Sequence, residues 1–259
     1  MSSEAVPALP TQDRRRAGLA AALAGILGIV SFAFLTTALV TRFQNDDPNL
    51  PDLEAVQEGP WTAWFRAQDV AVALQALLMI PVTLAMRSAQ GTSSGRGRGA
   101  AIIGMAGHAG VVLSVALVLA FRAHWADVLY MFPQGLIGIW LIAVCWSGSG
   151  LSNAHRVFGV IAGLGLALIA ASAAVMQNSL GWHELDVTTR PAVDVAAIHS
   201  SGNELGHDLL PFGTLLGRVI YPLWTIVLGW KLLRHSRLDP HVEIRTTDGV
   251  PSGPTLQKT

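Results

Sequence analysis

The chain has 259 residues, of which 51% are hydrophobic and only 13% are charged. That charged share is about half of the share in an ordinary soluble domain, so the composition excludes a typical soluble protein and places the chain among membrane proteins. The formal net charge is zero, the basic residues are too sparse for a nucleic-acid-binding surface, and the single cysteine excludes an internal disulfide.

The first apolar stretch covers residues 17–41, which carry no charge and follow a polar segment ending in three arginines. A cleaved signal peptide is the alternative, but its apolar region would have only about 7–15 residues. We therefore expect an uncleaved membrane-spanning helix here, preceded by an N-terminal tail over residues 1–16.

The second apolar stretch, residues 67–86, is separated from the first by a loop rich in acidic and turn residues. It contains Pro81. In a bilayer a proline of this kind kinks a helix instead of ending it, because neighbouring helices can pair the freed carbonyl. We expect a second span over this stretch, followed by a short basic segment.

Four more apolar stretches follow, and a tight connection between the first two of them predicts an antiparallel hairpin. A long connection, residues 177–211, precedes the last stretch, and residues 238–259 are expected to form a disordered tail. The predicted fold is all-α, one domain over residues 17–237 with six transmembrane helices and a long outer loop before the last. The four remaining spans are predicted at residues 100–121, 128–146, 157–176 and 212–233.

The basic residues indicate how these spans are oriented. Twelve of the 17 lie on the side that carries both termini, four lie on the other side, and Arg218 lies inside a span. Since cytoplasmic loops are enriched in lysine and arginine, both termini are predicted in the cytoplasm. Fifteen of the 17 are arginine, which, with the abundance of alanine, glycine and leucine, suggests a bacterial plasma membrane protein.

Arg218 is the least expected residue, because a charge within a span is costly and usually faces the bundle interior or a watery cavity. It lies about six residues, or roughly 9 Å, from the outer end of the predicted span. One interpretation is a structural arginine paired with Asp69 or Asp127. The other is an anion- or ligand-binding role, in which Tyr221, one helical turn away, shares its face.

His108 lies near the middle of the third span, where it is either a neutral structural histidine or a substrate or proton site. Haem held by two histidines would need a partner at similar depth, but His124 and His155 lie at opposite ends of the bundle. Retinal would need a lysine in mid-membrane, and Lys231 lies at the inner end. We expect neither cofactor.

Polar residues at the outer helix ends predict a pocket that opens outward. A short helix formed in part by residues 193–198 could cover it as a lid. Arg218, Asp69, Arg66, Asp127, His108 and Tyr221 are the ligand-binding candidates. The full set of polar residues expected at the outer ends is Arg66, Asp69, Gln75, Arg122, Asp127, Gln134, Gln177 and Arg218.

The long outer connection offers one weak metal site. Glu204 and His207 are one helical turn apart, which suits two ligands, but a third would have to come from elsewhere in the loop. Solvated loop residues that cap a helix are the other interpretation.

Three functions fit these features. The first is a non-enzymatic membrane protein that binds an amphipathic ligand, such as a lipid, or a partner subunit in the membrane through the outward pocket. The second is a transporter or permease component that uses Arg218 and His108. The third is a membrane enzyme with a metal at Glu204 and His207.

Overall fold

The computed structural model describes residues 11–45, 62–89, 95–121, 130–147, 151–180 and 204–238. All elements in these ranges are helices, so the predicted all-α class is confirmed. They are α1 (Thr11–Asn45), α3 (Thr62–Ala89), α4 (Gly95–Phe121), α6 (Met131–Trp146), α7 (Asn153–Leu180), α9 (Glu204–Leu215), the π-helix η2 (Leu216–Ile220) and α10 (Tyr221–Leu238). The last three follow one another without a break and form one rod, here called the last helix.

Five helical segments are long and apolar enough to cross a membrane, which makes this a multi-pass membrane protein. They are Gln12–Thr41, Thr62–Ser88, Gly97–Ala120, Asn153–Val175 and Leu209–Arg234. Helix α6 is equally apolar but has 16 residues. At 1.5 Å per residue it is about 24 Å long, which is less than the roughly 30 Å of a bilayer core.

The helices extend past several of the predicted boundaries. Helix α1 begins at Thr11, so the three arginines predicted in the N-terminal tail are helical. Helix α3 covers 62–89 and therefore includes Arg66 and Arg87, the two residues that directly flank the predicted second span, residues 67–86. Long basic side chains can stay on a helix at the membrane surface, because their stems lie along apolar surface while the charge reaches water. The predicted disordered tail lies almost wholly outside the described residues.

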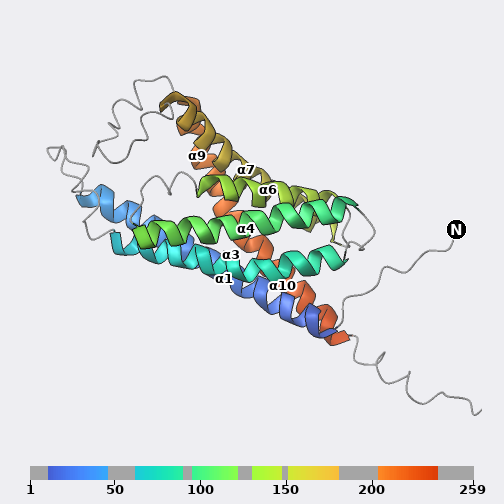
Figure 1. Ribbon diagram of the computed structural model, residues 1–259. Coiled ribbons are helices and arrows are strands. Elements are labelled where there is room, and N and C mark those ends of the chain that lie inside the picture. Colours follow the sequence, from blue (N-terminus) through green and yellow to red (C-terminus); the bar gives the residue numbers. More distant parts are fainter. Residues whose placement is uncertain are drawn as a thin grey trace, which may run out of the picture.

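The helices pack as a ring in chain order, each against the next, from α1 to α7 (Figure 1). The last helix closes the ring but changes neighbours along its length. Its first part, α9 and η2, packs on α7, whereas α10 packs on α1. The described parts of α1 and α10 meet on the side where α1 begins, here called the terminal side. The other side, where α1 ends and α9 begins, is called the far side.

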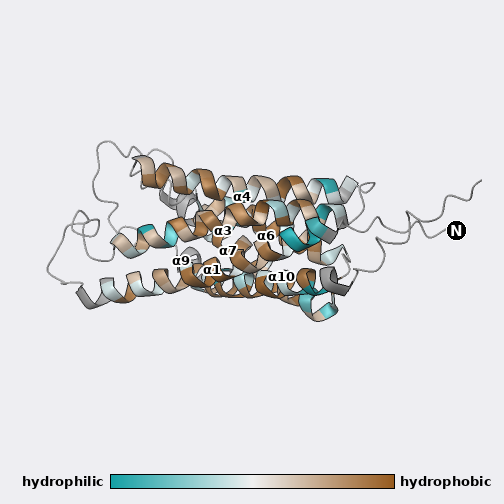
Figure 2. Ribbon diagram, turned by 90° about the horizontal axis from the view of Figure 1, so that it is seen from below, coloured by the Kyte–Doolittle hydropathy of each residue, from teal (hydrophilic) through white to brown (hydrophobic). Residues whose placement is uncertain are grey.

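Close contact between α1 and α10 depends on glycine. A Cβ added to Gly25 would lie 2.6 Å from the carbonyl oxygen of Pro222, and one added to Gly229 would lie 2.6 Å from the backbone nitrogen of Ala22. Small residues let helix backbones approach in this way when no hydrophobic effect drives helix association. Apolar residues cover most of the helix surfaces (Figure 2), and large ones such as Leu113 and Ile102 are exposed where lipid would cover them.

Candidate functional site

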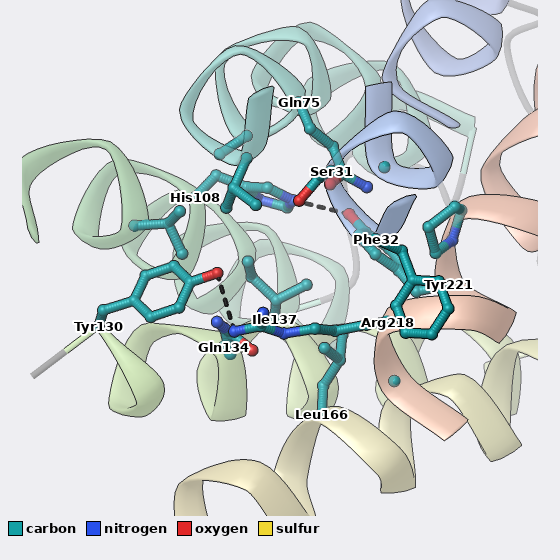
Figure 3. Close-up of a pocket in the computed structure, with 16 residues that line it drawn as sticks. Ser31, Phe32, Gln75, His108, Tyr130, Gln134, Ile137, Leu166, Arg218 and Tyr221 are labelled. Atoms are coloured by element: carbon teal, nitrogen blue, oxygen red, sulfur yellow. Dashed lines mark hydrogen bonds between the residues drawn. The ribbon is translucent and has the colours of Figure 1, made fainter. Parts of the chain in front are cut away.

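A pocket lies inside the ring and is lined by α1, α3, α4, α6, α7 and the last helix (Figure 3). Its empty volume is about 500 Å³, which includes the part that is open to the outside. Most of the wall is apolar, with a few polar groups, as is usual for small-molecule sites. The polar lining residues are Ser31, Gln75, His108, Tyr130, Gln134, Arg218 and Tyr221, and the apolar ones are Gly28, Phe32, Val72, Ala76, Val111, Ile137, Leu166, Gly217 and Pro222.

The polar groups reach the middle of the membrane. Gln75 lies at the midpoint of the span Thr62–Ser88, and Tyr221 lies next to the midpoint of the span Leu209–Arg234. His108 is equally central in the span Gly97–Ala120. Polar side chains at this depth are costly in a bilayer, and those that occur usually mark functional sites.

Arg218 enters the pocket from a π-helix. Its five residues, Leu216–Ile220, end two residues before Pro222. A proline has no N–H for the carbonyl four residues earlier, which here belongs to Arg218, and its ring crowds that carbonyl. The wider π turn gives the ring room. Such π segments often occur at functional sites.

The Arg218 side chain contacts Tyr130. One guanidinium N–H group donates a hydrogen bond of 3.2 Å to the Tyr130 hydroxyl, and the guanidinium carbon lies 5.4 Å from the centre of the tyrosine ring. Arg218 lies deeper in its span than predicted, because the span begins at Leu209 and not at residue 212. The partner of Arg218 among the described side chains is Tyr130, and no pairing with Asp69 is seen there. Asp127 lies outside the described residues.

His108 is fully buried and makes two hydrogen bonds. Its Nδ1 lies 2.6 Å from the carbonyl oxygen of Gly104, and its Nε2 lies 3.1 Å from the Tyr221 hydroxyl. A carbonyl oxygen only accepts, so we assign the proton to Nδ1, and in the neutral ring Nε2 accepts from Tyr221. The edge of Trp140 packs against the imidazole at 5.4 Å. His108 therefore fixes the position of the Tyr221 hydroxyl in the wall of the pocket.

Two buried glutamines in the pocket wall lack hydrogen-bond partners within the described structure. Gln134 is 5% exposed and neither of its amide atoms is paired, and Gln75 is 8% exposed with an unpaired Nε2. An unpaired buried amide group costs about 1–3 kcal/mol. Both side chains line the pocket, so a molecule bound there can pair with them.

The structure brings five of the predicted residues together and leaves others outside the pocket. Gln75, His108, Gln134, Arg218 and Tyr221 line it. Arg66 is exposed and Asp69 is half-buried on α3, and neither lines this pocket. The side chains of Arg122, Asp127 and Gln177, and the predicted lid at residues 193–198, lie outside the described part of the structure.

Ser31, Phe32 and Tyr130 line the pocket but were not predicted to. Ser31 is the only hydroxyl residue between residues 17 and 35, which is a signal that could have marked it. Phe32 and Tyr130 carried no such signal, because aromatic residues are ordinary in a span and at its ends.

The predicted metal site is not tested. Glu204 and His207 lie in the first turns of α9, but the positions of their side chains are not described. The residues whose side chains are described contain no group of three histidine, cysteine or acidic residues able to hold a metal ion.

These features define the class of protein: a multi-pass membrane protein, all-helical in the residues that the structure describes, whose bundle contains a largely apolar pocket with a few polar groups, including Arg218. Comparisons of the chain with protein-family models, with curated proteins and with solved structures found no match.

Proposed function

We propose that this protein is a non-enzymatic membrane protein that binds an amphipathic anion in its pocket. One observation carries the proposal. A largely apolar cavity contains a positive charge with no acidic residue among its described lining residues, together with an unpaired amide group. Arg218 has a cationic head there, and the amide groups of Gln134 are buried without partners in the described structure. A charge at this depth is tolerated when a partner compensates it, and an anionic ligand would supply that partner.

The finer topology belongs to the same proposal. Helix α6 would complete a sixth span, together with residues just before Met131. Both termini would be cytoplasmic and the pocket would open to the outside of a bacterial plasma membrane, as the distribution of basic residues favours. Cysteine-accessibility labelling at the end of α3 and at the start of α7 would test this orientation, because both positions should react only from the cytoplasmic side.

The proposal is tested by what remains bound after purification in a mild detergent. Native mass spectrometry of the wild-type protein should show an added mass close to one equivalent. The variant Arg218→Gln should lose most of it, because the charge that holds the anion is removed. The matched control is Arg234→Gln, which removes an exposed arginine from the same helix outside the pocket.

A bound mass that is equally retained in both variants would place the ligand elsewhere and contradict the proposal. The absence of any added mass in the wild-type protein, with an unfolding temperature that does not differ between wild type and Arg218→Gln, would also contradict it.

Transport is the second candidate, favoured by the last helix itself. That helix contains a π segment and two prolines, Pro211 and Pro222, next to a site at mid-depth. Transporters commonly bind their substrates at mid-depth between interrupted helices. Protein reconstituted in vesicles should then move the compound extracted from it, and Arg218→Ala should abolish this flux. No flux through the wild-type protein would remove this candidate.

A further inference from the structure

We infer that the ligand is a single-chain monocarboxylate whose acid group binds Arg218 and Gln134 and whose hydrocarbon chain leaves the pocket between α1 and α9 into the bilayer. This inference rests on the proposed function and specifies the ligand class and its route of entry.

The charge of the pocket favours one negative charge. Among the described residues that line the pocket, Arg218 is the only cationic side chain and none is acidic. A monoanion balances this single charge, whereas a dianion such as a phosphate monoester would leave a second charge buried and unpaired.

The geometry of the donors favours a carboxylate. A guanidinium group presents parallel N–H groups that match the two oxygens of a carboxylate. Tyr130 uses one Arg218 nitrogen and packs its ring against the guanidinium, which fixes the plane of that group. The Gln134 amide supplies a further N–H in the same pocket (Figure 3). The carboxylate would thus satisfy a donor that has no partner within the described structure.

The packing of the last helix indicates the direction in which the chain would leave the pocket. Helix α10 is held tightly against α1 by Gly25 and Gly229, but α9 turns away to pack on α7, so α1 and α9 separate toward the far side (Figure 1). Gly28, Ser31 and Phe32 on α1 and Arg218 on the last helix border the pocket where this separation begins. The pocket therefore lies where α1 and the last helix begin to diverge, and we place the exit of the chain between these two helices.

Apolar side chains are exposed on the parts of α1 and α9 that diverge from one another. Leu39 and Val40 are exposed on α1, and Phe212 and Leu215 are exposed on α9. A hydrocarbon chain that leaves the pocket toward the far side would meet apolar surface and lipid, so it can be longer than the pocket itself.

The test is competition for radiolabelled hexadecanoate on the full-length protein in phosphatidylcholine nanodiscs. Unlabelled hexadecanoate should compete. Hexadecanol should not, because it lacks the charge. Decanedioate, whose chain is too short to reach the far-side surface, should compete at least ~50-fold more weakly than decanoate, because its second carboxylate would have to lie in the bilayer. Hexanoate should compete at least ~100-fold more weakly, because its short chain buries less apolar surface and does not reach beyond the pocket.

Three variants check the residues. Arg218→Gln should lose labelled hexadecanoate, and Arg234→Gln should retain it. Gln134→Leu should bind it about tenfold more weakly, because one hydrogen bond to the charged group is lost. This variant removes an unpaired buried amide, so it is expected to fold at least as well as the wild-type protein.

The outcomes separate this inference from the proposed function. Equal competition by decanedioate and decanoate would show that the chain does not end in the bilayer. Equal competition by hexanoate and hexadecanoate would show that the length of the chain contributes nothing. Either result overturns the inference, as does a wild-type protein that binds no hexadecanoate. The proposed function would survive all three if an Arg218-dependent ligand still co-purifies.

Discussion

His108 and Tyr221 form the best-defined polar contact in the pocket, and each explains why the other is tolerated in the membrane. The imidazole would have an unpaired Nε2 without the Tyr221 hydroxyl, and its Nδ1 is already used by Gly104. The sequence placed both residues in the middle of spans. It could not show that they touch, because they are 113 positions apart and the depth of a residue does not tell which helix it faces.

Removing the Tyr221 hydroxyl should therefore destabilise the bundle. The variant Tyr221→Phe keeps the ring but leaves Nε2 of His108 buried without a partner, at a cost of about 1–2 kcal/mol. Thermal unfolding in detergent, followed by near-ultraviolet circular dichroism, would measure the loss.

The variant His108→Leu supplies the control for this contact. In that background the change Tyr221→Phe should cost much less, since the hydrogen bond is already absent. Equal costs in both backgrounds would mean that the hydroxyl stabilises the protein through some other group.

At the scale of an element, the π-helix is what turns Arg218 toward the pocket. The apolar pattern predicted a helix through this region, but a π turn depends on how Pro222 fits against α1, and that packing is not encoded in any local pattern. Gly28 lies against the Pro222 ring, where an added Cβ would approach within 2.9 Å of the proline Cβ. The charged residue was thus predictable, whereas the direction of its side chain was not.

Restoring an N–H group at residue 222 should change that direction. With Pro222→Ala the helix can close into regular α turns, which rotates the residues before it by up to about 100°, the angle per residue of an α-helix. We expect the variant to fold and to lose most of the co-purified mass in native mass spectrometry.

The other proline of the last helix gives a matched control. Pro211 is exposed in α9 and does not line the pocket, so Pro211→Ala should retain the ligand. If Pro222→Ala retained it as well, the π-helix would not be what positions Arg218.

At the scale of the whole molecule, the ring is closed by contact between the first and last helices. The sequence predicted the class of fold and the apolar stretches, because length and hydropathy are local properties. It did not predict that the last helix changes neighbours halfway along, since this follows from where small residues allow close approach. The fourth predicted span covered 128–146, whereas the described helix α6 begins only at Met131.

Gly25 should be critical for this closure. An added methyl group at Gly25→Ala would lie 2.6 Å from the Pro222 carbonyl oxygen, and the backbone there cannot move away easily. We expect a loss of about 1–3 kcal/mol in unfolding free energy, the usual range for overpacking. Denaturant titration in mixed micelles would measure it.

Gly99 is the control glycine, because a Cβ there meets nothing within 4 Å. The variant Gly99→Ala should be neutral or slightly stabilising, since alanine favours a helix more than glycine does. A similar loss in both variants would indicate that helix geometry, not contact between α1 and α10, sets the effect.

The closing contact also has a consequence for how the protein is made. Arg218, Tyr221 and Pro222 all belong to the last helix, which is synthesised after the other helices of the ring. Until that helix has entered the membrane, α1 lacks its α10 neighbour and the pocket lacks its cation. The pocket thus becomes complete only when the last helix has inserted. A chain stopped short of residue 204 would hold most of the described pocket wall but not Arg218.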